Sequence, residues 1–248
     1  HFLRILRLAL ATGAGAAAVF SLGLPRKPET DRHLEARLRI HHMSRWYTNL
    51  LSRLQLVEIE VRHPERLEAG GATLLVANHP SLIDIVPILA HVRDADCVVN
   101  AVRAHDVLFA GLIREAGYIQ NDGGNDVIKK AVGSLASGRS VIIFPEGTRS
   151  PPGGLGPFRR GAAHIALASG RPVTPISIFV DPPALTKNRR WWHLPRQRIH
   201  MTLDVGQRLS PSPRTRDEPR RALAARQLTA ELREAFSKEL ERERTPRG

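Results

Sequence analysis

Short apolar runs alternate with helical patterns from Val57 onward, and this alternation constrains the fold more than any other feature of the chain. The runs that indicate strands cover residues 57–61, 73–77, 97–102, 140–144, 174–180 and 199–205. Helical patterns lie between several of them, at residues 82–91, 106–116, 125–137 and 160–169. Strands that alternate with helices favour a largely parallel sheet with helices on its faces. We therefore expect one α/β domain over residues 56–210.

The length and charge of the chain agree with such a domain and indicate an anionic partner. With 248 residues, the chain can bury one sizeable core and carry appendages. Its formal net charge of +13 favours a membrane surface, nucleic acid or an acidic carrier as the partner. Cys97 is the only cysteine, so an internal disulfide is excluded and a reducing compartment is favoured. Its apolar "CVV" context indicates a buried small hydrophobe rather than a nucleophile.

Residues 1–55 are predicted to form a helical membrane anchor. The 17 residues from Leu8 to Leu24 carry no charge. As a helix they would cover roughly 26 Å, somewhat less than the ~30 Å hydrocarbon core of a bilayer. Arginines flank the segment on both sides, so the charge pattern gives no clear topology. We expect a helix that spans or half-enters the membrane; the alternative is a buried helix of the soluble domain.

Two further amphipathic helices are expected at the ends of the domain. Residues 34–56 combine leucines and aromatics at helical spacing with several arginines. That pattern suits either a membrane interface or a surface helix packed on its own domain. After a linker rich in proline and serine, residues 211–248 contain a charged helix over about 218–244. Its apolar stripe, which should dock on the domain, consists of Leu228, Leu232, Phe236 and Leu240.

A histidine and an aspartate follow the predicted strand 73–77 in the stretch "ANHPSLID". Pro80 suits the first turn of a helix, where its missing N–H would have no partner. Asp84 then lies just over one helical turn beyond the entrance, so its carboxylate can reach back to an imidazole nitrogen of His79. Such a carboxylate would hold one tautomer and raise the basicity of the other ring nitrogen.

A second polar turn follows a strand in "VIIFPEGTRS" (141–150). Gly147 allows backbone N–H groups to approach an anion, and Arg149 offers a planar fork for a phosphate. In open α/β sheets, ligands bind beyond the carboxyl ends of the strands. If the two strands are parallel neighbours, His79 and Glu146 face one crevice.

These stretches resemble the conserved blocks of a known enzyme family. "NHPSLID" resembles the His-x4-Asp motif of the glycerolipid acyltransferases, the family of the 1-acylglycerol-3-phosphate acyltransferases, and "FPEGTRS" matches the third block of that family. "VTPISI" (173–178) is similar to the fourth block. "FRRGAAHIA" (158–166) is similar to the segment that follows the third. The resemblance covers about residues 56–205.

The resemblance implies a catalytic role for two residues and a binding role for others. His79 would be the general base and Asp84 would orient it. The acceptor hydroxyl would attack the thioester of acyl-CoA or acyl carrier protein directly, without a metal, a cofactor or an acyl-enzyme. The candidate substrate-binding residues are Asn78, Ser81, Arg103, Glu146, Gly147, Thr148, Arg149, Arg159 and Arg160.

One departure from the family pattern bears on the acceptor. The second block usually ends in an arginine that meets the glycerol phosphate, whereas this chain has Gln120, Asn121 and Asp122 in that region. Asp122 would repel a phosphate unless a nearby arginine compensates. We expect a lysophospholipid acceptor, 1-acylglycerol-3-phosphate first, because the third block is intact. A different lipid acceptor, with an aminolipid or glycolipid hydroxyl, is the alternative.

The loop 185–198 combines basic residues with Trp191 and Trp192. This composition suits an anionic lipid surface, nucleic acid or a solvated loop. We expect membrane lipids and no nucleic acid, because the N-terminal segment also indicates a membrane. The expected location is the cytoplasmic face of the bacterial inner membrane. A non-catalytic basic binding protein and a thioester hydrolase are the rival functions.

Overall fold

The computed structural model of the chain describes residues 28–68, 71–101, 110–124, 126–187, 194–211 and 218–244. The predicted apolar helix over residues 8–24 lies outside these ranges, as do Arg103, Trp191 and Trp192. The elements follow one another in the order α2 (Glu29–Arg53), β1 (Val57–Arg62), α3 (Glu65–Glu68), β2 (Leu74–Ala77), α4 (Ile85–His91), β3 (Ala95–Asn100), α6 (Ala110–Ala116), β4 (Ile119–Asn121), α7 (Asp126–Ala136), β5 (Ser140–Ile143), α8 (Gly161–Ser169), β6 (Val173–Asp181), β7 (Ile199–Val205) and α9 (Glu218–Arg244).

The strands of the described residues form one seven-stranded sheet in the order β1-β7-β6-β2-β5-β3-β4. Neighbouring strands are parallel except for β6 and β7, which are antiparallel. The prediction of a largely parallel α/β sheet is thus confirmed. Because β6, β2, β5, β3 and β4 all run in the same direction, their carboxyl ends meet at one edge, the edge that we call the carboxyl edge.

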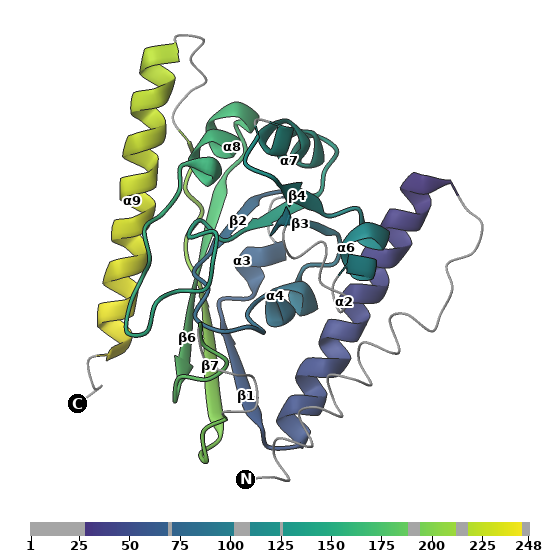
Figure 1. Ribbon diagram of the computed structural model, residues 1–248, viewed down its shortest axis with the longest axis vertical. Helices are drawn as coiled ribbons and strands as arrows, with labels where there is room; N and C mark the ends of the chain where they lie inside the picture. Colours follow the sequence, from purple (N-terminus) through teal and green to yellow (C-terminus); the bar gives the residue numbers. More distant parts are fainter. Residues whose placement is uncertain are drawn as a thin grey trace.

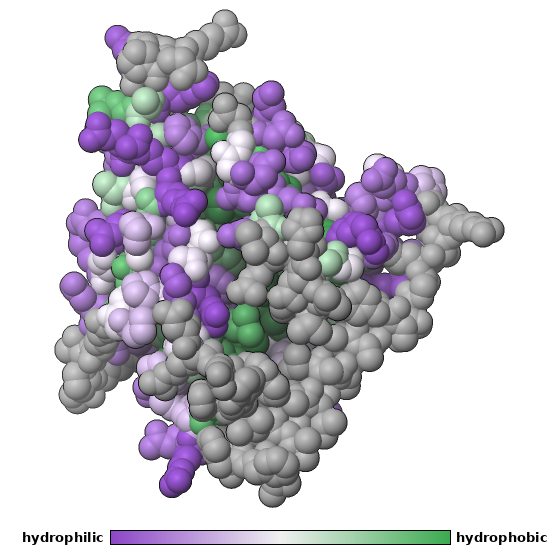
Figure 2. Space-filling view, viewed as in Figure 1, coloured by the Kyte–Doolittle hydropathy of each residue, from purple (hydrophilic) through white to green (hydrophobic). Residues whose placement is uncertain are grey.

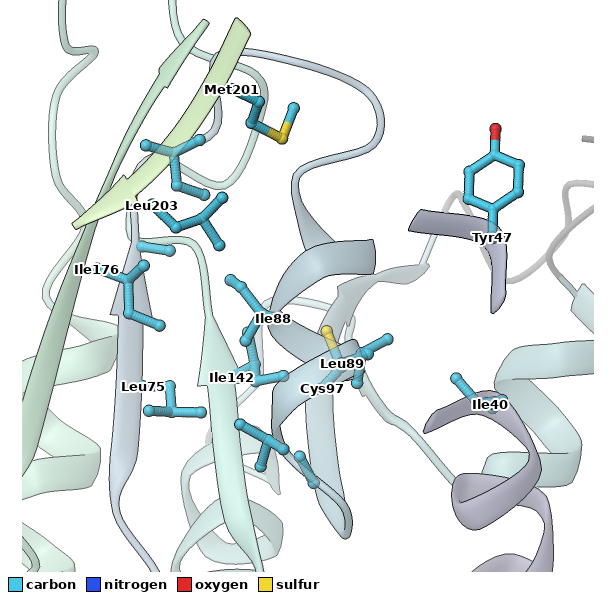
Figure 3. Packing of buried hydrophobic residues seen from close by; sticks show 14 of the residues in the cluster. Ile40, Tyr47, Leu75, Ile88, Leu89, Cys97, Ile142, Ile176, Met201 and Leu203 are labelled. Atoms are coloured by element: carbon cyan, nitrogen blue, oxygen red, sulfur yellow. The ribbon is translucent and has the colours of Figure 1, made fainter. Parts of the chain in front are cut away.

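The sheet separates two hydrophobic cores. Along β2, Leu75 and Ala77 face one core, and Leu74 and Val76 face the other; all four are fully buried. Helices α2, α4 and α6 cover the first face, whose packing is shown in Figure 3. Helices α7, α8 and α9 cover the second face. The result is a sheet between two helical layers, with α2 and α9 on opposite sides of the molecule (Figure 1).

Helix α2 packs on the domain along one face. Tyr47 and Leu51 belong to the same core as β2 and α4. Arg37, also buried, donates from Nε to Asp94 at 2.6 Å and from Nη1 to the carbonyl oxygen of Ala116 at 3.0 Å. Of the two predictions for residues 34–56, a surface helix packed on its own domain is therefore confirmed for this face of α2. The opposite face is in solvent, where the side chain of Trp46 is 44% exposed.

Helix α9 docks on the second face of the sheet as its apolar stripe predicts. Leu228, Leu232 and Phe236 are buried among residues of α7 and α8, and Leu240 is half-buried. The ring of Phe236 meets that of Phe158 edge to face, with centroids 5.5 Å apart. Among the described helices, none is apolar over a length sufficient to cross a membrane.

Candidate active site

His79 and Asp84 meet at the carboxyl edge, directly after β2. His79 lies in the extended segment between β2 and α4, and Asp84 is the residue before α4. The Nδ1 atom of His79 and the Oδ2 atom of Asp84 are 2.8 Å apart. The same Oδ2 accepts the backbone N–H of Ser81 at 2.7 Å. The five-residue spacing therefore brings the imidazole and the carboxylate into direct contact.

Asp84 lies in the interior of the protein. Its side chain is 0% exposed, and Oδ1 has no hydrogen-bond partner among the described residues. Burial raises the pKa of the Asp84 carboxyl above its usual value, although the hydrogen bonds from His79 and Ser81 and the charge of Arg149 act in the opposite direction. The Asp84 carboxyl group thus meets the His79 imidazole from inside the protein, where electrostatic interactions are stronger than in water.

The His79 imidazole is the exposed member of the pair. Its side chain is 21% exposed, and its ring stacks on that of Phe144, with centroids 4.3 Å apart and planes at 24°. Because Nδ1 faces Asp84, Nε2 is the nitrogen left for other contacts, and none is recorded for it within the described residues. An ionised carboxylate only accepts, so Nδ1 carries the proton and Nε2 presents a lone pair.

The second polar turn lies beside the histidine, as parallel pairing of β2 and β5 requires. Glu146 Oε1 accepts the backbone N–H of His79 at 3.2 Å. Gly147 has φ +68°, a left-handed conformation that favours glycine. A Cβ added at Gly147 would lie 3.1 Å from Nε of Arg159, whose side chain therefore covers this turn. Strands β2 and β5 are thus parallel neighbours that bring residues 79 and 146 into contact, and the expected shared crevice stays a prediction.

Three of the candidate substrate-binding side chains face the protein interior instead of the carboxyl edge. Asn78 exchanges two hydrogen bonds with the backbone of Ile178 in β6, at 2.9 and 2.7 Å. Ser81 is buried at the start of the turn that leads to Asp84, and Glu146 is only 4% exposed. Each of these side chains is engaged by neighbouring backbone or side-chain groups of the fold, and its expected role in substrate binding stays a prediction.

The remaining candidates stay at the surface of the turn or close to it. Arg149 is half-buried and donates from Nη1 to the carbonyl oxygens of Leu185 and Thr186, at 2.8 and 2.9 Å. Thr148, Arg159 and Arg160 are exposed. The last candidate, Arg103, lies outside the described residues.

The residues that replace the expected arginine form the end of β4 and the turn after it. Asn121 Oδ1 accepts the N–H of Gly123, and Asp122 Oδ1 accepts the N–H of Gly124. Strand β4 lies three strand spacings from β2, about 14 Å away at the usual spacing. Asp122 is exposed at the same edge as His79. Strand β4 is not predicted by the sequence, because its three residues are too few to produce a strand pattern.

Neither a thiol nor a metal is indicated as the reacting group. Cys97 is buried in β3, and burial raises the pKa of its thiol to about 12, which confirms the interpretation as a buried hydrophobe. Over the described parts of the chain, no group of three or more His, Cys, Asp or Glu side chains is placed to hold a metal ion. What the described residues do place at this edge is a histidine–carboxylate pair.

Comparisons with known proteins agree with this geometry. Residues 58–179 match the family model described as acyltransferase. The chain is 30% identical over 144 residues to human 1-acyl-sn-glycerol-3-phosphate acyltransferase beta, a match that covers 53% of this chain and 50% of the relative. It is 31% identical over 140 residues to the Escherichia coli 1-acyl-sn-glycerol-3-phosphate acyltransferase, covering 54% and 57%. The chain carries an acyltransferase domain of the glycerolipid acyltransferase family.

A solved structure supports the same fold for the acyltransferase domain. The crystal structure of the 1-acyl-sn-glycerophosphate (LPA) acyltransferase PlsC from Thermotoga maritima superposes with a TM-score of 0.72 and 22% identity. That superposition covers 100% of this chain and 97% of the other. In contrast, the sequence matches span only about half the length of the curated relatives.

Ser150, a polar residue of this candidate site, has no role that the sequence predicts. Ser150 donates from its backbone N–H to the carbonyl oxygen of His79 at 2.7 Å, and its Oγ accepts the N–H of His79 at 3.2 Å. The serine was visible as the last letter of "FPEGTRS", but a serine at a turn is common and carries no sign of its partner. Only the folding of two distant turns against each other identifies it.

Proposed function

We propose that the chain is a membrane-bound O-acyltransferase that moves a fatty acyl group from acyl-CoA or acyl carrier protein to a lysophospholipid hydroxyl, with 1-acylglycerol-3-phosphate as the leading acceptor. The observation that carries the proposal is the hydrogen-bonded pair of His79 and Asp84 at the carboxyl edge, next to the turn of residues 144–150. The names of the relatives support the same reaction.

The arrangement supports a direct transfer with His79 as general base. Nε2 of His79 takes the proton of the acceptor hydroxyl while the hydroxyl oxygen attacks the thioester carbonyl carbon. The new C–O bond forms, the C–S bond breaks, and the imidazolium returns its proton to the thiolate that leaves. The products are an ester and a free thiol, and the protein forms no covalent intermediate. A burst of acyl-enzyme is therefore not expected.

The identity of the acceptor depends on the cations near the turn. Arg149, Arg159 and Arg160 supply positive charge on one side of the edge, which favours a phosphate headgroup. Asp122, exposed beyond β4, favours the second candidate, a lipid whose reacting hydroxyl belongs to an aminolipid or a glycolipid. A panel that compares lysophosphatidic acid with other lysolipids and with hydroxylated aminolipids and glycolipids distinguishes the two.

The test of the proposal is an acyl-transfer assay with labelled palmitoyl-CoA and palmitoyl carrier protein as donors. We expect His79→Ala to lower the transfer rate by about 10²- to 10⁴-fold, the usual contribution of a general base. His200→Ala, which alters an exposed histidine of β7, serves as the matched control. The readout is labelled ester formed per minute, with free fatty acid measured in parallel without acceptor.

Three results would contradict the proposed reaction. Equal rates above background for wild type and His79→Ala would remove His79 as the base, and rates at the protein-free background for both, with every donor and acceptor, would indicate a non-catalytic binding protein. Release of free fatty acid at the full rate without any acceptor would identify a thioester hydrolase.

The membrane part of the proposal rests on the outward face of α2. The side chains of His42, Arg45, Trp46 and Arg53 are exposed on the face opposite the buried one. In Figure 2, other hydrophilic residues gather at the N-terminal end of this helix. Basic residues with a tryptophan suit the boundary of an anionic membrane, where an acyl acceptor resides and a soluble thioester can reach it. The cytoplasmic face of a bacterial inner membrane meets these conditions.

Neutralising this face should weaken membrane binding. We expect Arg45→Gln/Arg53→Gln to reduce the affinity for vesicles that contain anionic lipid by about 30-fold, because each surface cation contributes about 1 kcal/mol. The control is Arg226→Gln/Arg233→Gln, two exposed arginines of α9 on the other side of the sheet. Vesicle flotation of the full chain measures both. Equal losses in the two double variants would show a general charge effect and remove α2 from the proposed membrane contact.

A further inference from the structure

Both oxygens of the buried Glu146 carboxylate accept hydrogen bonds from groups of the protein itself. Oε1 accepts the backbone N–H of His79 at 3.2 Å and the hydroxyl of Ser150 at 2.6 Å. Oε2 accepts the backbone N–H of Gly156 at 2.7 Å. With 4% of the residue exposed, a negatively charged headgroup could reach this carboxylate only by entering the protein and meeting like charge.

Ser150 holds the same histidine from its other side. The Oγ atom of Ser150 accepts the His79 N–H at 3.2 Å, and the backbone N–H of Ser150 donates to the His79 carbonyl oxygen at 2.7 Å. Both backbone polar groups of His79 are thus bound by residues of the turn after β5. None of these bonds belongs to a helix or a strand ladder. The N–H of His79 is held by the side chains of Glu146 and Ser150, and its carbonyl oxygen is held by the backbone of Ser150.

We propose that Glu146 and Ser150 form a clamp that fixes the backbone of His79, and that both are positioning residues, not substrate ligands. The inference rests on the proposed function, because it concerns the base of that reaction. The clamp joins three segments that are distant in sequence: the turn of His79, the turn of residues 144–150, and the loop that contains Gly156.

The geometry explains why a proton-transfer site needs such a clamp. A general base acts only within about 2.6–3.2 Å of the atom that carries the proton, and a misplacement of about 1 Å can cost roughly 100-fold in rate. Asp84 orients the ring of His79 through Nδ1, and Phe144 stacks on it. Neither contact fixes the backbone from which the ring projects. Glu146 and Ser150 hold this backbone in place.

Two glycines on either side of Leu155 provide a sharp test that leaves every polar side chain chemically unchanged. A Cβ at Gly156 would lie 2.7 Å from Oε2 of Glu146, closer than real Cβ contacts allow, so the carboxylate must move. A Cβ at Gly154 would meet nothing within 4 Å. Neither glycine has a positive φ, so alanine is free of backbone strain at both. Gly156→Ala therefore disturbs the clamp, and Gly154→Ala is its matched control.

The expected result separates positioning from binding. We expect Gly156→Ala, Ser150→Ala and Glu146→Gln each to lower kcat by about 10- to 100-fold, with the KM for the acceptor unchanged. Gly154→Ala should match the wild type. Glu146→Gln is a strict test because both carboxylate oxygens accept hydrogen bonds, whereas an amide has only one acceptor oxygen. The NH₂ group of the glutamine would therefore face at least one N–H or O–H donor that Glu146 now binds. The effects of Ser150→Ala and Glu146→Gln should also be far from additive, because both loosen the same bond.

A measurement without turnover makes the inference independent of the reaction. The exchange rate of the His79 amide hydrogen should rise at least tenfold in Ser150→Ala and in Gly156→Ala, and stay unchanged in Gly154→Ala. An exchange rate that is the same in all variants overturns the clamp, even for a chain that transfers no acyl group. If wild type and Gly154→Ala transfer nothing to any acceptor while the exchange rates differ as expected, the proposed function fails and the clamp stands.

The remaining outcomes also decide between alternatives. A raised KM for the acceptor with an unchanged kcat in Glu146→Gln would assign Glu146 to the headgroup and overturn the inference. The three clamp variants could instead show a lowered thermal midpoint while kcat per folded molecule and the exchange rate of the His79 amide stay unchanged. The contacts would then only stabilise the fold, and this result would also overturn the inference.

Discussion

An Asp84→Asn variant is expected to lose acyl transfer by about 10³- to 10⁴-fold while the protein stays folded. Asp84 accepts a hydrogen bond from the Nδ1–H group of His79, which keeps the ring proton on Nδ1. An asparagine can instead donate its amide hydrogen to Nδ1, which would place the ring proton on Nε2 and remove the lone pair that acts as base. The measurement is the steady-state rate of ester formation. The control is Asp126→Asn, an exposed aspartate that pairs with Lys130 on the surface of α7.

The same variant should not be less stable at neutral pH. Burial raises the pKa of Asp84, so the folded protein binds this proton more tightly than the unfolded chain does. The free energy of unfolding therefore falls as the pH rises from about 4 through the folded pKa, and the loss persists at pH 7. Asparagine carries no charge, so this loss is absent in the variant. Urea unfolding of both proteins between pH 4 and pH 8 measures the difference.

A wild-type protein that is more stable than Asp84→Asn at pH 7 would contradict this account, because the carboxylate would then gain more from its partners than burial costs it. Activity that survives in Asp84→Asn at a tenth of the wild-type rate or more would remove Asp84 from the role of orienting the base. The two measurements separate the stability role of the carboxylate from its role in the reaction.

The long strands and helices could be read from the sequence because their patterns repeat over enough residues. Strand β7 spans residues 199–205 as predicted, and the other predicted strands lie within about two residues of their observed limits. The helix expected over residues 82–91 begins instead at Ile85, because Ser81 and Asp84 form the turn that presents the histidine. The start of this helix is thus set by the site and not by the apolar pattern.

The contents of the site could be predicted only where they depend on local spacing. His79 and Asp84 are five residues apart, and the chain geometry alone brings them together. Glu146 was predicted to share their crevice because parallel strands end at one edge, but its direction was not predictable. The carboxylate turns inward because Gly156 comes back to meet it, and this contact depends on the path of the intervening loop. Ser150 was missed for the same reason.

Helix α2 illustrates a pattern that has two physical readings. Its arginines and aromatics suit a membrane boundary, and its apolar positions also suit a domain surface. The structure uses one face for packing, with Tyr47 buried and Trp46 exposed. Adjacent aromatic residues of a helix point about 100° apart, so the sequence places one of them on each face without showing which face meets the sheet.

A Phe236→Ala variant is expected to lower the free energy of unfolding by about 3–5 kcal/mol, the largest effect on stability that we expect from α9. Phe236 is 0% exposed, and its removal would leave a cavity beside Phe158 and the apolar residues of α8. Leu223→Ala, at a 54% exposed leucine of the same helix, should change the unfolding free energy by about 0.5 kcal/mol or less. Urea unfolding measures both.

A third variant decides whether burial or charge holds α9 on the domain. Glu243 of α9 accepts two hydrogen bonds from Arg62 of β1, at 2.7 and 3.1 Å, and these bonds raise the pKa of that guanidinium. The pair is partly exposed, so Glu243→Gln should cost only about 1 kcal/mol. A loss for Glu243→Gln as large as that for Phe236→Ala would contradict burial as the main source of docking. The expected order instead makes α9 an integral part of the second core, so unfolding should remain a single transition in which α9 and the sheet are lost together.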